Sequence, residues 1–326
     1  MSAPDDELYM RRALQLAANG RGYTSPNPMV GAVVVARRRI IGEGWHRRFG
    51  GPHAEVNAMN SIAEADLPLV GEATIYVTLE PCSHYGKTPP CAAMLVERGV
   101  RRVVVGSGDP NPKVSGRGIA MLRQAGIEVD TGVLEKECEA LNEAFMTAHR
   151  RHRPFVILKW AQSADGYIDG RFSRPDGRQL VHWRRAQADA IIVGAGTVLA
   201  DNPSLTVRDI EGRSPRPVVL DRRGLLVGSD LPLMRREDTI HVTSGESLRA
   251  VLERLYGELG YITVLVEGGA GVLGGFIAEG LWDRAYVECS PDGIRGTVKA
   301  PSLLCQPATA YPLPPNTVFE YRNPAL

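Results

Sequence analysis

The chain has 326 residues, about twice the size of a common domain, so two domains with separate cores are expected. Its 38 lysines and arginines against 37 aspartates and glutamates leave a formal net charge of +1, which argues against nucleic acid or an acidic membrane as a partner. Five cysteines, an odd and sparse number, argue against a disulfide framework and favour metal binding or catalysis for a clustered pair.

The first residues, "MSAPDDELYM", are acidic where a signal peptide is basic. No stretch of the sequence approaches the ~18 uncharged apolar residues that a membrane span requires. We therefore expect a soluble protein of the cytoplasm.

The first half alternates segments of helical and of strand periodicity, which predicts an α/β layer fold with helices on both faces of a central sheet. The basic segment 149–154, "HRRHRP", is interpreted as the join, which gives domains 1–149 and 150–326. Helices are predicted at 7–20, 54–65, 91–99, 116–126 and 134–150, and strands within 29–46 (two), 73–80, 100–110 and 127–133.

The second half repeats this alternation without repeating the motifs, so a second α/β domain is predicted. A buried strand begins at Pro154 and runs into a polar loop. The further strand-like segments lie within 188–208, 216–224, 239–245, 261–269 and 284–290, and helices are expected at 247–260 and 271–282.

Four residues of the first half indicate a metal site. His53 and Glu55 open a predicted helix in "GPHAE", Cys82 follows a strand in "EPC", and Cys91 opens the next helix. Zinc-dependent nucleobase deaminases hold Zn²⁺ with one His and two Cys, while a non-ligand Glu transfers protons, in the signature H-x-E then P-C-x-x-C. Three protein ligands leave the fourth position open for water, which a catalytic zinc needs.

The spacing of the cysteines departs from that signature, because eight residues separate Cys82 from Cys91. The segment "SHYGKTPP" has the glycine and prolines of a loop that turns out and returns to the next helix. One alternative is two buried cysteines unrelated in space to the His-Glu pair. Another is a structural zinc with His84 as a fourth ligand, which would abolish catalysis.

At these residues the sequence resembles the bifunctional deaminase/reductase family of riboflavin biosynthesis. The resemblance rests on "TSPNPMVGAVVV", "GPHAEVNAM", "TLEPCSHYGKTPPC" and "GDPNPKVSGRGI" in the first half, and on "LKWAQSADG", "RRAQADAIIVGAGTVLADNPSLTVR" and "VEGGAGVLGGF" in the second. It covers almost the whole chain and implies a cytidine-deaminase-like domain followed by a dihydrofolate-reductase-like domain.

The family implies a zinc-dependent deamination of 2,5-diamino-6-ribosylamino-4(3H)-pyrimidinone 5′-phosphate, followed by NADPH-dependent reduction of the ribosyl group to ribityl. Carried onto matching positions, His53, Cys82 and Cys91 bind zinc and Glu55 transfers protons. The resemblance assigns the pyrimidine nucleotide to Asn27, His46, His84 and Lys87. Read alone, His46 would favour a core or surface role.

The second half contains Gly269-Ala270-Gly271-Val272-Leu273-Gly274, a formal G-x-G-x-x-G, with Glu288 about twenty residues from its first glycine. Too few residues follow it to build a Rossmann half, and the resemblance implies a dihydrofolate-reductase-like fold instead. It assigns NADPH to Ala161, Thr197, Asp201 and the loop Gly269 to Gly275, and substrate to Arg185, Leu205, Arg208 and Glu267.

Three features depart from the family pattern. The segment from Gly166 to Arg185 is shorter than usual and lacks a Ser that contacts substrate, and Arg222 stands where some members place a Ser near the cofactor. The segment "ECSPDGIRG" differs from the usual apolar, proline-containing strand end. Two alternatives stay open: a deaminase with a degenerate, non-reducing second domain, and a zinc-stabilised nucleotide-binding module. The expected partner is a small pyrimidine nucleotide, with no nucleic acid or membrane, and the expected assembly is a homo-oligomer.

Overall fold

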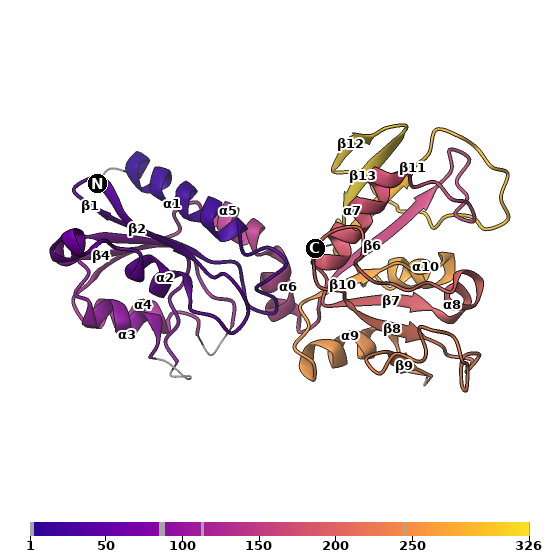
Figure 1. Ribbon diagram of the computed structural model, residues 1–326, viewed down its shortest axis with the longest axis horizontal. Coiled ribbons are helices and arrows are strands. Elements are labelled where there is room, and N and C mark those ends of the chain that lie inside the picture. The colour runs from indigo at the N-terminus through magenta and orange to yellow at the C-terminus, as the bar shows by residue number, and fades with distance from the viewer. Residues whose placement is uncertain (1–2, 85–88, 112–113, 244, 326) are drawn as a thin grey trace. The chain divides into compact units, whose positions relative to one another are not determined.

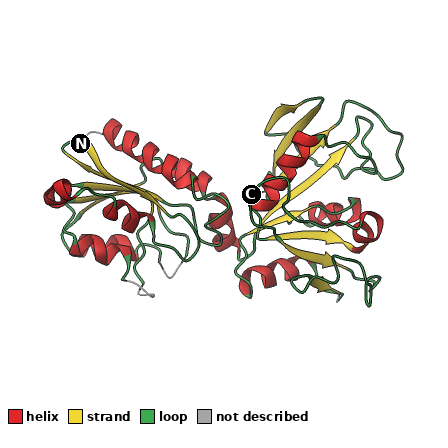
Figure 2. Cartoon of the chain, in the orientation of Figure 1, coloured by secondary structure: helices red, strands yellow, loops and turns green. Residues whose placement is uncertain are grey.

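The computed structural model describes residues 3–84, 89–111, 114–243 and 245–325, and the chain divides into two compact units, Met1–Arg151 and His152–Leu326 (Figure 1). In each unit helices flank a central sheet (Figure 2). Among the described residues, no helix is both long and apolar enough to cross a membrane.

The sheet of the first unit has five strands in the order β2-β1-β3-β4-β5. β1 is antiparallel to β2 and β3, whereas β3, β4 and β5 are parallel. Parallel strands buried on both faces are built from continuous apolar runs, as in "TIYVTL" and "VVVGS". The strands are β1 Gly31–Ala36, β2 Arg39–Trp45, β3 Thr74–Leu79, β4 Arg102–Ser107 and β5 Glu128–Thr131.

Helices cover both faces of this sheet, as predicted. Figure 1 shows α1 and α5 along one face and α3 and α4 along the other. Alternate strand residues divide between two cores, with Val33 and Tyr76 packed under α1 and Val34 and Ile75 in the opposite layer. The helices are α1 Ala3–Ala18, α2 Ala54–Asn60, α3 Cys91–Glu97, α4 Arg117–Gln124, α5 Glu135–Leu141 and α6 Glu143–Arg151, with a 3₁₀ segment at Glu64–Glu72.

The predicted helix 134–150 is wrong as a single element, because it breaks at Asn142 into α5 and α6. The buried Asn142 side chain accepts a hydrogen bond from Met29 N and donates one to Met29 O, both at 2.8 Å. A side chain that satisfies two backbone groups of a distant loop stabilises the break, since buried polar groups are costly without partners. The same two hydrogen bonds between Asn142 and Met29 also hold the loop that carries Asn27.

The second unit has an eight-stranded sheet in the order β12-β13-β11-β6-β10-β7-β8-β9. The strands from β11 to β9 in this order are parallel, and only β13 and β12 run antiparallel to their neighbours. The strands are β6 Phe155–Gln162, β7 Ala190–Gly194, β8 Arg216–Leu220, β9 Ile240–Val242, β10 Thr263–Val266, β11 Arg284–Cys289, β12 Thr309–Leu313 and β13 Asn316–Arg322.

The helices of the second unit are α7 Pro175–Ala186, α8 Ala195–Asp201, α9 Leu248–Gly257 and α10 Ala270–Ala278. The sequence did not predict α7, α8, β12 or β13, and the segment 188–208, expected as strand-like, holds β7 followed by α8. The α7 segment contains a glycine, Gly177, which approaches the Glu288 carboxylate so closely that a Cβ would lie 3.1 Å from it. The hairpin formed by β12 and β13 turns at Pro314-Pro315, a dipeptide that ordinarily argues against strands.

Candidate active sites

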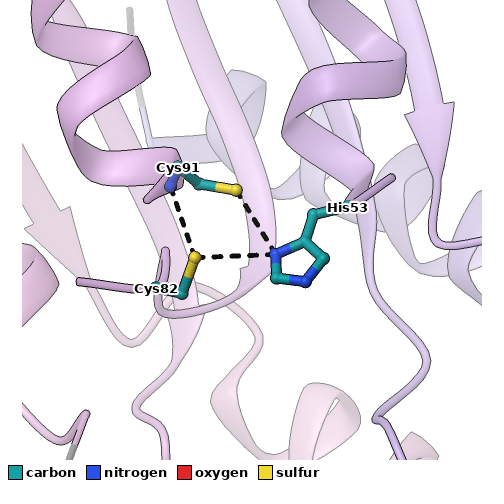
Figure 3. A group of neighbouring side chains, drawn as sticks. All are labelled: His53, Cys82 and Cys91. Carbon is teal, nitrogen blue, oxygen red and sulfur yellow. Dashed lines mark hydrogen bonds between the residues drawn. The ribbon is translucent and has the colours of Figure 1, made fainter. Parts of the chain in front are cut away.

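Three side chains from separate segments of the first unit point toward one another (Figure 3). His53 Nδ1 lies 3.6 Å from Cys82 Sγ and 3.4 Å from Cys91 Sγ. Among the described residues, His53, Cys82 and Cys91 form the one group of His, Cys, Asp or Glu that could hold a metal ion. The alternative of two cysteines unrelated to His53 is therefore wrong, and exposed His84 is not part of the group.

The N-terminus of α3 brings Cys91 next to Cys82, although eight residues separate them in the sequence. Pro90 caps the helix with extended backbone, and Cys91 is its first residue. Cys91 N donates a hydrogen bond to Cys82 Sγ at 3.3 Å, and Ala92 N donates to Cys82 O at 3.1 Å. Free N–H groups at a helix start favour negative charge, so this turn stabilises the Cys82 thiolate as well as placing it.

The spacing of the three atoms fits zinc. Bonds of about 2.0 Å to nitrogen and about 2.3 Å to sulfur at tetrahedral angles set nitrogen and sulfur about 3.5 Å apart. The two N–S distances, 3.4 and 3.6 Å, lie on either side of that value. One imidazole and two thiols leave the fourth position without a protein ligand among the described residues, which is the arrangement of a catalytic rather than a structural zinc.

The charges of the site suit a cation. The hydrogen bond with Cys91, opposed by burial and aided by His53, lowers the pKa of the Cys82 thiol. The hydrogen bond to Cys82 raises the pKa of His53, against the effect of burial. A thiolate is the form in which cysteine binds metal, so the lowered pKa favours the ligand form of Cys82.

Glu55 is buried beside these ligands, with 3% of its surface exposed. Burial raises its pKa to about 7, with His53 opposing the shift and Cys82 adding to it. A carboxyl group that titrates near neutrality can both accept and return a proton, as general acid-base catalysis requires. The placement of Glu55 inside the site, one residue into α2, agrees with a role other than that of ligand.

Asn27 and His46 form a hydrogen-bonded pair next to His53. His46 Nδ1 donates to Pro52 O at 3.0 Å, so its Nε2 accepts from Asn27 Nδ2 at 3.1 Å. Burial lowers the pKa of His46, which keeps the ring neutral and this arrangement intact. The rings of His46 and His53 meet edge to face at 5.6 Å between centroids. His84 is exposed, and Lys87 lies outside the described residues.

The second unit has a pocket of about 320 Å³ between the ends of β7 and β8 and the start of α10. At Gly271 the backbone faces open space, because an added Cβ there would meet nothing within 4 Å. The lining is Gly194, Ala195, Gly196, Leu220, Asp221, Arg222, Arg223, Leu225, Leu248, Gly271, Val272, Gly275 and Glu279. The glycine-rich segment thus presents backbone to a cavity, as a phosphate-binding loop does.

The structure places the predicted cofactor residues around this pocket to different degrees. Thr197 Oγ1 accepts a hydrogen bond from Gly269 N at 3.0 Å, which ties α8 to the start of the glycine loop. Ala161 lies on β6 opposite Glu288 of β11, and Asp201 ends α8 in an exposed position. Neither of these two residues lines the pocket.

Glu288 is not the ribose-binding acid that a Rossmann pattern would require. It is buried and accepts hydrogen bonds from Ser173 Oγ and Asn316 Nδ2, both at 2.6 Å. These bonds join β11 to the segment before α7 and to β13. The strand order likewise excludes a Rossmann sheet.

Two of the predicted substrate residues of the second unit form a bidentate ion pair. Arg185 Nε and Nη2 lie 3.0 and 2.7 Å from the Glu267 carboxylate oxygens. Burial raises the pKa of Glu267, but the charge and hydrogen bonds of Arg185 outweigh it and hold the pKa below its usual value. Arg185 Nη1 also donates to Thr206 O at 3.1 Å, beside Leu205 and Arg208.

The sequence reasoning missed Lys159. The register pairs Leu158 of β6 with Val266 of β10, so Lys159 comes beside Glu267 at the same edge of the sheet. Desolvation lowers the pKa of Lys159, and Glu267 and Glu288 oppose that shift. A half-buried lysine within an otherwise apolar strand, "FVILKWAQ", was the available signal, because lysine side chains are mostly exposed.

Comparisons with known proteins decide the family. Residues 3–107 match the cytidine and deoxycytidylate deaminase zinc-binding region, and residues 154–306 match the RibD C-terminal domain. The chain is 40% identical over 315 residues to riboflavin biosynthesis protein RibD of Aquifex aeolicus, covering 88% of this chain and 87% of that protein. The chain belongs to the RibD family.

Solved structures of RibD proteins share the fold along the whole chain. Acinetobacter baumannii RibD is 33% identical with a TM-score of 0.89, and 98% of each chain is covered. A Thermotoga maritima protein named diaminohydroxyphosphoribosylaminopyrimidine deaminase/5-amino-6-(5-phosphoribosylamino)uracil reductase is 38% identical with a TM-score of 0.89, covering 98% of this chain and 99% of that one.

RibD membership confirms the predicted fold class, a cytidine-deaminase-like domain followed by a dihydrofolate-reductase-like one. It also confirms the predicted function at the level of a bifunctional deaminase and reductase of riboflavin biosynthesis. The zinc-binding deaminase region supports Zn²⁺ as a cofactor, and the RibD C-terminal domain is consistent with a nucleotide cofactor. A degenerate second domain and a zinc-stabilised binding module are not favoured.

Proposed function

We propose that this protein deaminates 2,5-diamino-6-ribosylamino-4(3H)-pyrimidinone 5′-phosphate and then reduces the ribosyl group of the product with NADPH. Residues 1–149 carry the first step and residues 150–326 the second, in the cytoplasm. The observation that carries the proposal is the convergence of His53, Cys82 and Cys91 beside buried Glu55, in a chain whose second unit holds the Arg185–Glu267 pair and a glycine-lined pocket.

In the deaminase, His53, Cys82 and Cys91 hold zinc, which when bound activates the attacking water. Glu55 takes up a proton from that water and delivers protons to the pyrimidine ring and to the departing ammonia. Its raised pKa suits both directions of transfer. Asn27, oriented by His46, presents its amide to the heterocycle, and exposed His84 together with Lys87 receives the phosphoribosyl arm.

In the reductase, NADPH supplies the reducing equivalents, and the residues of the chain position the two reactants. Thr197, Ala161, Asp201 and the glycine loop from Gly269 to Gly275 are assigned to the cofactor, and Gly271, Val272 and Gly275 of that loop line the pocket. Arg185, Leu205, Arg208 and Glu267 face the ribosyl phosphate. A guanidinium suits the phosphate, because its planar fork binds two oxygens at once.

Two arginines of the pocket lining favour NADPH over NADH. Arg222 and Arg223 are exposed and make no side-chain hydrogen bond or ion pair within the described part of the chain. Buried Asp221 fixes their turn by accepting hydrogen bonds from Leu225 N and Leu226 N at 2.9 and 2.8 Å. Two unpaired cations on a rigid turn suit the 2′-phosphate that distinguishes NADPH from NADH.

Replacing both Arg222 and Arg223 by Ala is expected to raise the KM for NADPH roughly 10- to 100-fold, because charge-assisted hydrogen bonds contribute about 1.5–3 kcal/mol. The KM for NADH, which lacks that phosphate, is expected to stay within about twofold of the wild-type value. Steady-state absorbance assays with each cofactor measure both constants. The variant Arg98→Ala/Arg101→Ala removes the same charge from exposed positions of the first unit and serves as the control. Equal losses with both cofactors would contradict the assignment.

The proposed function is tested by a coupled assay of the purified full-length chain with the diaminopyrimidine nucleotide. Ammonia release and NADPH absorbance are followed in the same sample. We expect one ammonia per substrate, followed by oxidation of one NADPH. Ammonia release without NADPH oxidation would show that the chain is a deaminase but not a reductase. The absence of both signals would refute the proposed function.

A further inference from the structure

The segment Ser204 to Asp209 carries two of the proposed substrate residues, yet it has no helix or strand of its own. Leu205 is buried with a φ of 53°, in the left-handed region that a branched side chain rarely adopts. Backbone in such a conformation persists only where its surroundings enforce it. The side chains that hold this segment in place therefore decide where Arg208 stands.

Two residues one turn apart on α7 hold it. Arg185 Nη1 donates to Thr206 O at 3.1 Å while its other nitrogens bind Glu267. His182 Nδ1 accepts a hydrogen bond from Arg208 N at 3.1 Å, and its Nε2 lies 3.4 Å from Asp209 Oδ2. His182 is 2% exposed. The Arg208 side chain is 56% exposed, and within the same segment its Nη1 donates to Ser204 Oγ at 3.1 Å and its Nε lies 3.9 Å from Asp209 Oδ1.

These contacts fix the tautomer of His182. An imidazole nitrogen that accepts from a backbone N–H carries no proton, so the proton is on Nε2 and is donated toward Asp209. His182 thus contacts the backbone of Arg208 through Nδ1 and the side chain of Asp209 through Nε2. Its ring is buried, and among the described residues its one hydrogen bond is that from Arg208 N.

We propose that His182 is a positioning residue of the reductase, whose unprotonated Nδ1 holds the backbone of Arg208 so that the guanidinium is aimed at the phosphate of the pyrimidine substrate. This inference rests on the proposed function, since it takes Arg208 as a substrate contact. It adds a residue that touches neither substrate nor cofactor. The recognised group is a phosphate monoester on the ribosyl arm.

Protonation of the ring would undo the contact, because Nδ1–H and the N–H of Arg208 would then both be donors. The charged groups that act on His182 are Arg185 from α7, Arg208 and Asp209 from the held segment, and Glu267 from the end of β10. Burial, together with the two arginines, keeps the pKa of His182 below its usual value, against Asp209 and Glu267. Hence the neutral ring predominates at neutral pH, and the hydrogen bond from Arg208 N to His182 Nδ1 is lost as the pH falls and the ring is protonated.

Three substitutions separate this role from mere packing. The carbonyl oxygen of an Asn side chain occupies the place of Nδ1 and can accept from Arg208 N, whereas the amide of a Gln occupies the place of Nε2 and cannot. For His182→Ala and His182→Gln we expect the KM for 5-amino-6-(5-phosphoribosylamino)uracil to rise about tenfold, the effect of one lost hydrogen bond to an aligned group. For His182→Asn we expect a KM within about twofold of the wild type, with kcat little changed in all three.

The assay follows NADPH oxidation by the full-length chain supplied with the deaminated substrate, at pH values from neutral to acidic. The ratio of wild-type to His182→Asn KM is expected to rise as the pH falls, since only the wild type loses its acceptor, while titration of the substrate phosphate cancels in the ratio. Thermal unfolding of each variant reports its folding.

Unchanged KM in His182→Ala would overturn the proposal, as would equal increases in His182→Asn and His182→Gln. A pH-independent ratio would also overturn it. Failure of the wild-type chain to oxidise NADPH with this substrate would instead refute the proposed function, so the two failures are distinguishable.

Discussion

Glu55→Gln is expected to lower the kcat of deamination by about 10²–10⁴-fold, the range that a positioned general acid-base contributes. The amide has nearly the shape of the carboxyl group but can neither accept nor return a proton. It also removes the cost of burying a charge at a position that is 3% exposed, so the first unit is expected to fold. Ammonia release under saturating substrate measures kcat, and metal analysis reports the zinc content.

The zinc content of Glu55→Gln is expected to equal that of the wild type, because His53, Cys82 and Cys91 are unchanged. Glu64→Gln makes the same chemical change at an exposed position and is expected to retain full activity. Deamination that persists in Glu55→Gln with zinc bound would show that another group transfers the proton.

Removal of one metal ligand is expected to have a still larger effect. Cys91→Ser replaces a thiol by a weakly acidic hydroxyl and disrupts the contact with His53 Nδ1, which is 3.4 Å from the sulfur. We expect zinc to fall well below one equivalent and deamination to fall by at least about a thousandfold, because activation of water depends on the metal. Metal analysis and ammonia release measure the two quantities.

The reductase provides an internal control for that variant. The residues proposed for reduction lie in the unit His152–Leu326, so NADPH oxidation with the already deaminated substrate is expected to persist in Cys91→Ser. Cys305→Ser, at a partly exposed cysteine of the second unit, is expected to leave both activities intact. Stoichiometric zinc and normal ammonia release in Cys91→Ser would refute the ligand set.

Local signals predicted most of the fold and the three residues that we propose as zinc ligands. Apolar runs such as "GAVVVA" and "TVLV" are strands in the structure, and the H-x-E and P-C motifs place His53 and Cys82 at a helix start and a strand end. These predictions depend on neighbours in the sequence. The spacing to Cys91 was interpretable because proline and glycine signal a returning loop regardless of what it contacts.

The features that the sequence did not predict depend on contacts between distant residues. The helix break at Asn142 is stabilised by hydrogen bonds to Met29, 113 positions earlier. The residues next to Asn142 in the sequence do not predict this contact. The strands β12 and β13 pair along a proline-containing hairpin, so their residues lack the usual strand pattern. Lys159 and His182 acquire their surroundings only when β10 and the 204–209 segment pack against them.

The two hydrogen bonds between Asn142 and Met29 also affect the order in which parts of the chain fold during synthesis. The ribosome releases the three proposed zinc ligands first, since Cys91 precedes Asn142 by about fifty residues. The loop carrying Asn27 acquires its two bonds only after residue 142 has emerged. A nascent chain that ends soon after residue 107, where the match to the zinc-binding region stops, would therefore contain the three metal ligands but leave the substrate loop untethered.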